Sequence, residues 1–134
     1  MKIKVSELEG NALDWAVAKC GYKDHALEKN NGGSLSFDAG LHPYMADLNN
    51  DNRWQVYKPS GNWAQGGPII EREEIGISLN LPCSDGRRWR AVPSVTAKGA
   101  GGKFGYGHTP LIAAMRCYVA TKRGDEIEVP DQFI

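Results

Sequence analysis

ISLNLPCSDGRRWRAV, residues 77–92, is the stretch that decides the fold class. Apolar and polar residues alternate over Ile77–Leu81 and again over Arg88–Val92, which is typical of strands that bury one face. The intervening Ser84-Asp85-Gly86 is a turn signal, and a proline bounds each strand. The stretch therefore predicts an antiparallel hairpin.

Helical patterns lie on both sides of this hairpin. Apolar spacing over Ser6–Cys20 predicts a first helix, with a serine cap at its start and Gly21 at its end. A second helical region is expected over Ser60–Ile75, interrupted at Gly66-Gly67-Pro68 because proline lacks an N–H and clashes with the preceding turn. Thr109–Arg123 has a threonine cap, a proline at its first position and a glycine after its last, so it predicts a third helix.

The remaining segments are less regular. Short strands are expected over Ser34–Phe37 and Trp54–Tyr57, in a hairpin or irregular excursion. Residues 94–108 are expected to form a glycine-rich loop, and residues 125–134 a short acidic tail. The order of elements predicts a single α+β domain spanning residues 1–134, with a small antiparallel sheet packed by about three helices.

Composition excludes several classes of protein. The chain has 134 residues, and 16 Lys+Arg balance 16 Asp+Glu, which argues against a generally basic nucleic-acid-binding protein. No apolar run approaches the length of a membrane helix, and the start of the chain has no apolar signal segment. The three cysteines share no metal-binding spacing and indicate reduced thiols. A soluble cytoplasmic protein without a bound metal is therefore expected.

The charges are segregated along the chain. Between Gly86 and Gly124 there is no Asp or Glu, whereas the same span holds eight Lys and Arg residues; the rest of the chain carries a net charge of −8. One interpretation is a set of ordinary surface charges paired with acids elsewhere in the fold. The other is a local site for an anionic ligand.

The glycine-rich stretch Gly99–Gly107 supports the second interpretation. It leads directly to the helix that starts at Thr109, and free N–H groups of a glycine-rich loop and of a helix N-terminus both attract phosphate. Lys103 and His108 add positive charge there. The stretch has neither a P-loop motif nor a dinucleotide-binding fingerprint, and a flexible surface loop is the alternative interpretation.

Aromatic residues complete the predicted site. Trp63 precedes two glycines that leave room for a flat ring, and a nucleobase stacks on an aromatic face with roughly 1–3 kcal/mol. Burial in the core is the alternative for Trp63 and the favoured interpretation for Trp89. The predicted ligand-binding residues are Trp63, Gln65, Gly66, Arg87, Arg88, Arg90, Lys103, Tyr106, His108 and Thr109.

No catalytic constellation is evident in the sequence. His25, His42 and His108 are scattered, and there is no nucleophile elbow or metal-binding histidine motif. A binding protein without a cofactor is therefore favoured over an enzyme.

Three blocks of the sequence resemble the bacteriophage NinX family. They are residues 1–8 (MKIKVSEL) with 13–20 (LDWAVAKC), residues 62–71 (NWAQGGPIIE), and residues 109–120 (TPLIAAMRCYVA) with 129–131 (VPD). The resemblance implies a small phage accessory protein in the cytoplasm of the bacterial host, similar in layout to the phage ABA-sandwich domains. Residues 22–57 depart from the family pattern, and Asn62 stands where the commoner motif has Asp. No catalytic residues come with the resemblance.

Three functions remain open at this point. The first is a non-catalytic protein that sequesters a small nucleotide-like anion, with a role in counter-defence suggested by analogy alone. The second is a factor that binds recombination or replication proteins of the phage or host. The third is a nucleotide-processing enzyme. A homo-oligomer is compatible with each of them, and none requires a membrane or a nucleic-acid partner.

Overall fold

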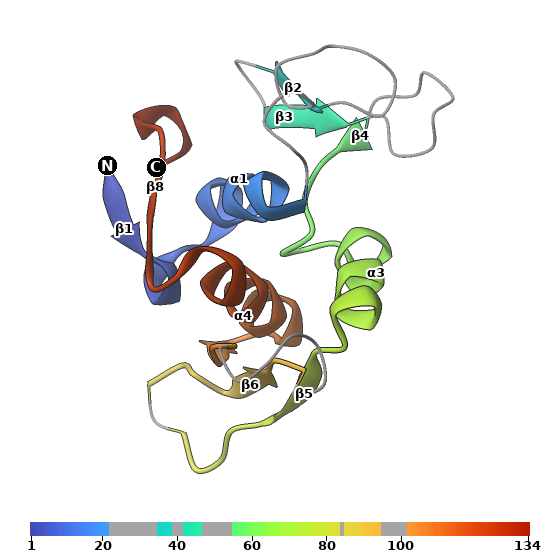
Figure 1. The fold of residues 1–134 in the computed structure, drawn as a ribbon, viewed down its shortest axis with the longest axis vertical. Helices are drawn as coiled ribbons and strands as arrows, with labels where there is room; N and C mark the ends of the chain where they lie inside the picture. The colour runs from blue at the N-terminus through green and yellow to red at the C-terminus, as the bar shows by residue number, and fades with distance from the viewer. Residues whose placement is uncertain (22–34, 39–41, 47–54, 84, 95–101) are drawn as a thin grey trace.

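The computed structural model describes residues 1–21, 35–38, 42–46, 55–83, 85–94 and 102–134. These residues form three α-helices, α1 (Gly10–Gly21), α3 (Trp63–Glu73) and α4 (Pro110–Arg123), and three small antiparallel sheets. The predicted α+β class is therefore confirmed. Figure 1 shows α4 in the middle of the arrangement, between the helix α1 and the sheet that contains β5 and β6. None of the described helices is both long and apolar enough to cross a bilayer.

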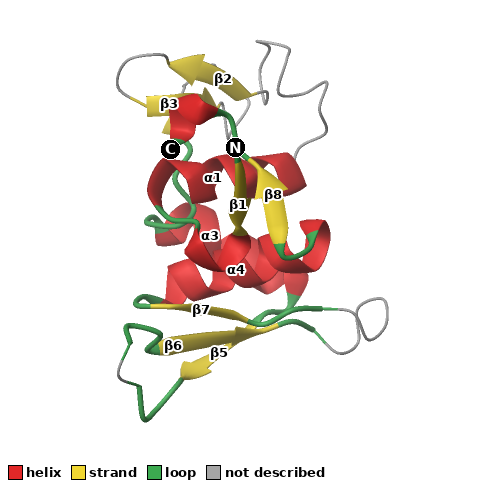
Figure 2. Ribbon diagram, turned by 90° about the vertical axis from the view of Figure 1, so that its left-hand side faces the viewer, coloured by secondary structure: helices red, strands yellow, loops and turns green. Residues whose placement is uncertain are grey.

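The predicted hairpin is present. β5 (Gly76–Leu79) pairs with β6 (Trp89–Val92) in antiparallel register, with Ile77 opposite Ala91. A third strand, β7 (Gly105–Gly107), extends this sheet beyond β6, and Figure 2 shows all three strands lying against one side of α4. The expectation of a loop throughout residues 94–108 was therefore wrong for 105–107. Gly-Tyr-Gly has little strand propensity of its own, so its pairing depends on its neighbours.

The two glycines of β7 allow the sheet to approach α4 closely. A Cβ atom on Gly105 would lie 2.2 Å from the carbonyl oxygen of Ala113, and one on Gly107 would lie 2.7 Å from Cγ2 of Ile112. Both distances are shorter than any carbon contact allows. Glycine is therefore required at these positions by helix–sheet packing, since any side chain would push the strand away from the helix.

Helix α4 matches its sequence prediction. The Thr109 hydroxyl accepts a hydrogen bond from the N–H of Ile112 at 3.1 Å, Pro110 occupies the first position, and Gly124 ends the helix with φ of 92°. Most of its residues are buried, among them Leu111, Ala113, Ala114, Met115, Cys117, Tyr118, Val119 and Ala120. A helix buried on nearly every side is the centre of the hydrophobic core, with α1, α3 and the β5–β7 sheet packed around it.

Helix α1 begins later than predicted. Val5–Glu7 forms a short 3₁₀ turn, Leu8 is extended with ψ of 135°, and the α-helix begins at Gly10, whose φ is +57°. Ser6 therefore does not cap this helix. Leu8 is buried, and its carbonyl accepts a hydrogen bond from Arg116 of α4, so tertiary contacts hold the segment out of the helix.

Helix α3 is continuous, which corrects the predicted interruption at Pro68. Asn62 caps the helix by accepting a hydrogen bond from the N–H of Ala64, and Pro68 lies inside it. Gly67 explains the tolerance, because a residue without a Cβ relieves the clash that proline imposes on its predecessor. The helix ends at Glu74, which adopts the left-handed conformation with φ of 54°, and not at a glycine.

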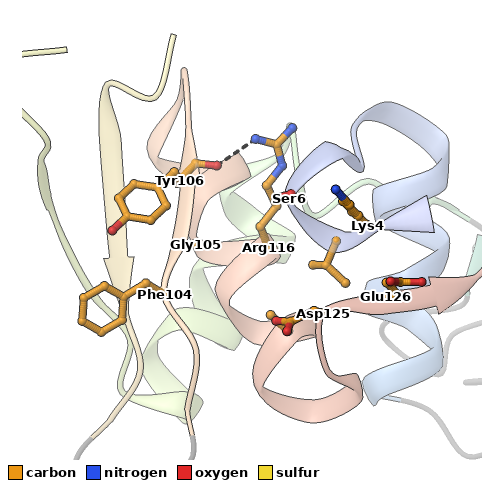
Figure 3. A pocket seen from close by; sticks show the side chains of 10 residues that line it. Lys4, Ser6, Phe104, Gly105, Tyr106, Arg116, Asp125 and Glu126 are labelled. Carbon is orange, nitrogen blue, oxygen red and sulfur yellow. Dashed lines mark hydrogen bonds between the residues drawn. The ribbon is translucent and has the colours of Figure 1, made fainter. Parts of the chain in front are cut away.

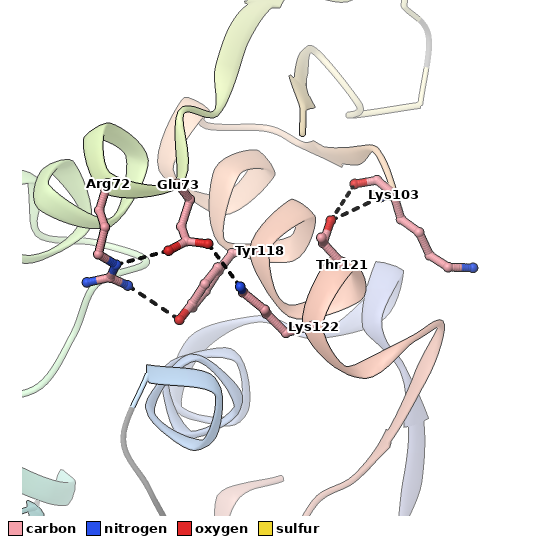
Figure 4. Close-up of polar contacts among 6 residues, drawn as sticks. All are labelled: Arg72, Glu73, Lys103, Tyr118, Thr121 and Lys122. Atoms are coloured by element: carbon pink, nitrogen blue, oxygen red, sulfur yellow. Dashed lines mark hydrogen bonds and ion pairs between the residues drawn. The ribbon is translucent and has the colours of Figure 1, made fainter. Parts of the chain in front are cut away.

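Figure 4 shows the polar contacts that join the C-terminal halves of α3 and α4. Arg72 donates to the Tyr118 hydroxyl at 3.4 Å, and Lys122 forms an ion pair with Glu73 at 3.2 Å. Near the other end of the two helices, Gly66 lies against Leu111, since a Cβ on Gly66 would lie 2.6 Å from its Cδ2. The two helices therefore run side by side in the same direction.

The outer strands were only partly anticipated. β1 (Lys2–Lys4) pairs with β8 (Glu126–Glu128), so part of the expected tail is a strand. A second three-stranded sheet consists of β2 (Leu35–Asp38), β3 (His42–Ala46) and β4 (Gln55–Val56). The first and last of these agree with the predicted short strands, whereas β3 was not predicted. The other residues of the irregular region 22–54 lie outside the described part of the chain.

Candidate functional site

One face of the β5–β7 sheet is left open by the described elements. Ser78, Arg90 and Tyr106 are neighbours in register across the three strands. The adjacent row contains Ile77, Ala91 and Gly105, and Gly105 abuts α4. Because side chains alternate between faces along a strand, the Ser78 row points away from the helix. No described helix or strand covers this outer face (Figure 2).

Two arginine–aromatic pairs occupy the outer face. The Arg87 Cζ lies 5.7 Å from the centre of the Tyr106 ring, and the Arg90 Cζ lies 6.0 Å from the centre of the Phe104 ring. Such pairs contribute about 0.5–1 kcal/mol each at exposed sites. We call these four residues, Arg87, Arg90, Phe104 and Tyr106, the Arg–aromatic face. It offers flat rings for stacking together with guanidinium donors for an anion.

The charges on this face are only partly neutralised. Arg87 forms an ion pair with Asp85 at 2.6 Å, and its hydrogen bond lowers the pKa of the Asp85 carboxyl. Arg88 and Arg90 have no carboxylate within ion-pair distance among the described residues. The Nε of Arg90 is buried and has no hydrogen-bond partner among the described residues. Positive charge is therefore left over beside the rings.

The glycine-rich segment serves packing where the structure describes it. Gly105 and Gly107 make room for α4, and a Cβ on Gly102 would lie 2.4 Å from the Pro93 side chain. Gly99 to Gly101 lie outside the described residues. The Lys103 backbone N–H donates to Thr121 near the C-terminal end of α4 (Figure 4). The Lys103 ammonium pairs with Asp125 at 3.0 Å. Lys103 thus lies at the opposite end of α4 from Thr109.

The start of α4 offers few free donors. Pro110 has no N–H, and the N–H of Ile112 is bonded to the Thr109 hydroxyl. His108 is exposed immediately before this helix. A phosphate at this position would therefore depend on the helix dipole and on side chains from neighbouring elements.

Trp63, Gln65 and Gly66 come from the first turn of α3, beside the start of α4. Trp63 is 55% exposed, so the core interpretation of this residue is wrong. Gln65 is buried, and its side-chain oxygen accepts a hydrogen bond from the backbone N–H of Lys58. Gly66 has no free space around it, since it lies against Pro59 and Leu111. The structure thus brings these residues near Thr109 and places the Arg–aromatic face on the outer side of the sheet.

Sequence reasoning missed two charged residues that α-helices carry into the interior. Asp14 of α1 is 1% exposed; its Oδ1 accepts from the Ser60 N–H at 2.8 Å, and burial raises the pKa of its carboxyl to about 6. Arg116 of α4 is half-buried and donates to two backbone carbonyls. The sequence did carry a signal for both, because Asp14 and Arg116 each stand among the apolar residues of a helix, which indicates a position near the core. No group of three metal-ligating side chains is present in the described residues.

The fold and the site define a small α+β protein whose sheet is packed by α4 on one side and presents arginines and aromatic rings on the other. A sequence model of the family described as bacteriophage P22 NinX matches residues 4–122, and the chain belongs to this family. The matched residues include the whole of the second block (62–71), residues 109–120 of the third block and most of the first, whereas residues 129–131 lie beyond the match. No curated protein matches the chain.

Proposed function

We propose that this phage protein is a non-catalytic binding protein that sequesters a small anionic, nucleotide-like ligand on the Arg–aromatic face. The observation that carries the proposal is the placement of Arg87 over Tyr106 and Arg90 over Phe104 on an open sheet face. A base stacked on one of these rings gains roughly 1–3 kcal/mol, and a guanidinium beside it provides paired donors for a phosphate. Counter-defence in the host cytoplasm is the role that such sequestration would serve.

Calorimetric titration with a panel of cyclic dinucleotides and ADP-ribose derivatives tests this proposal. We expect saturable binding by at least one member, and chromatography of the mixture is expected to return the ligand intact. Arg90→Gln and Tyr106→Leu are each expected to weaken binding at least tenfold. Arg123→Gln is the matched control, because it removes one positive charge at the far end of α4. A folded sample that binds no member of the panel would overturn the proposal, and turnover of the ligand would support an enzyme instead.

A second function is supported by apolar residues beside the same cations. Leu79 and Leu81 are 46% and 58% exposed at the end of β5 that leads into the arginine-containing turn. Apolar side chains at the centre of a patch and charges at its rim are typical of protein interfaces. In this second proposal, the surface binds an acidic recombination or replication protein.

Pull-down from infected cells distinguishes the two functions. The protein-binding function predicts that Leu81→Ser removes the captured partner as completely as the triple variant Arg87/Arg88/Arg90→Ala. The ligand-binding function predicts that Leu81→Ser leaves the calorimetric titration unchanged, since Leu81 is not part of the Arg–aromatic face.

A further inference from the structure

A separate cavity of about 350 Å³ lies between β7 and the paired strands β1 and β8. Its lining includes Lys4, Ser6, Gly105, Arg116, Asp125 and Glu126. Figure 3 shows that the rings of Phe104 and Tyr106, which border it through their backbone, point away from the cavity. Strand β7 therefore separates this cavity from the Arg–aromatic face. The volume is near the lower end of the range for small-molecule sites, about 300–1,000 Å³.

Arg116 gives the cavity an uncompensated positive charge. Its Nε donates to the Leu8 carbonyl at 2.8 Å and its Nη1 to the Tyr106 carbonyl at 2.7 Å. Both partners are neutral, and no carboxylate of the described residues forms an ion pair with it. Burial lowers the pKa of this guanidinium, and Glu9 provides a weaker opposing effect. A charged side chain is almost never fully buried without a partner. The part-buried Arg116 bonds only to two neutral carbonyls among the described residues, so its guanidinium retains capacity for an anion.

The lining carries charges of both signs. Figure 3 shows Ser6 and the Lys4 ammonium toward the Arg116 guanidinium, whereas the carboxylates of Asp125 and Glu126 lie farther from it. Lys4 and Glu126 are register partners in the β1–β8 pair, yet no ion pair joins them. The Asp125 carboxylate pairs with Lys103 at 3.0 Å, whereas Glu126 forms no ion pair among the described residues. A ligand with only negative charges would meet these carboxylates, and one with only positive charges would meet Arg116 and Lys4.

We propose that this cavity binds a small amphoteric molecule of the ω-amino-acid type, with a carboxylate beside Arg116 and Lys4 and an ammonium beside Asp125 and Glu126. Each charged group of the ligand then meets opposite charge. The Arg116 guanidinium is part-buried, so its hydrogen bonds to an anion are stronger than those of the exposed Lys4, Asp125 and Glu126. This site goes beyond the proposed nucleotide-like ligand, because it uses other residues on the other side of β7.

NMR titration of the full ¹⁵N-labelled chain tests the inference. The probes are acetate, butylammonium, and a series of ω-amino acids from glycine to 6-aminohexanoate. We expect at least one ω-amino acid to bind with a Kd below about 1 mM and at least tenfold more tightly than either single-charge probe. Shifts are expected at the amides of Ser6, Gly105 and Glu126.

Substitutions on one strand pair provide matched controls. Lys4→Gln and Glu126→Gln are each expected to weaken binding at least fivefold, whereas Lys2→Gln and Glu128→Gln, on the same two strands but outside the cavity, leave it unchanged. Arg90→Gln is also expected to leave ω-amino-acid binding unchanged. Loss of the proposed nucleotide-like binding and loss of cavity binding can therefore be told apart. The inference would be overturned if acetate bound as tightly as the ω-amino acids, or if no probe gave saturable binding. It would also be overturned if the control variants weakened binding as much as the cavity variants.

Discussion

Asp14 is a single residue whose burial links the stability of the fold to pH. Its carboxyl has a pKa of about 6 in the folded chain against 3.8 as the ordinary value, and burial is the largest cause. The folded state therefore binds more protons than the unfolded state between these two values. Stability from this group is fully present below about pH 4 and is lost as the pH rises through 6.

The Asp14→Asn variant tests this linkage. Asn keeps an oxygen that can accept from the Ser60 N–H but carries no charge. Relative to the original protein, we expect the variant to gain about 2–3 kcal/mol of unfolding free energy between pH 4 and pH 7.5, since two pKa units correspond to that amount. Urea unfolding of both proteins across this range measures the difference. Parallel pH profiles would show that Asp14 does not titrate as described.

Gly105 is the residue at which the sheet and α4 come closest. Gly105→Ala would place a Cβ 2.2 Å from the Ala113 oxygen, and backbone atoms cannot move aside as a flexible side chain can. We expect a loss of about 3 kcal/mol or more in the free energy of unfolding. Gly76→Ala in the same sheet is the control, because its Cβ would meet nothing nearer than 4.0 Å. Equal denaturation midpoints for the two variants would contradict this account of the glycine.

At the scale of elements, the helices and strands that were predicted have local signals. Thr109, Pro110 and Gly124 mark the ends of α4, and alternation marks β5 and β6; these depend on neighbouring residues alone. β7 was missed because its pairing depends on α4 and β6, and β8 because its partner lies at the other end of the chain. Gly67 was interpreted as part of an interruption, whereas it is what allows Pro68 inside α3.

The candidate site was less predictable than the fold. Arg87, Arg90 and Tyr106 were predicted as ligand-binding residues, but their shared face depends on β7, which the sequence did not indicate. The Arg116 cavity was not foreseen at all. The cavity brings together residues near the start of the chain, such as Lys4, and residues near its end, such as Glu126. A pattern of neighbouring residues cannot predict that such distant segments meet.

The cap of α4 yields a prediction for an element. The Thr109 hydroxyl accepts from the N–H of Ile112, so Thr109→Ala is expected to lower the free energy of unfolding by about 1 kcal/mol. Thr109→Ser keeps the acceptor and is expected to change it by only a few tenths. Urea unfolding at pH 7 measures both. Equal destabilisation by the two variants would mean that the methyl group, and not the cap, supports the helix.

At the scale of the whole molecule, the balanced net charge conceals an uneven distribution. Three cations of the acid-free span pair with acids outside it: Arg87 with Asp85, Lys103 with Asp125, and Lys122 with Glu73. The interpretation of paired surface charges therefore holds for these three cations, and the anionic-ligand site stays a prediction. Arg88, Arg90 and Arg116 form no ion pair among the described residues, so part of the positive charge of the span remains. That remainder is divided between the outer sheet face and the cavity behind β7.

This division predicts different salt dependence at the two sites. The Arg–aromatic face is open to solvent, so raising NaCl from about 50 mM to about 500 mM is expected to weaken binding of a nucleotide-like anion at least fivefold, because salt screens exposed charges. An amphoteric ligand in the cavity has no net charge, and the Arg116 guanidinium that meets its carboxylate is part-buried, so its affinity is expected to change less than twofold. Titrations of both ligands at the two salt concentrations measure these ratios. Equal salt dependence would contradict the two environments that the fold creates on either side of β7.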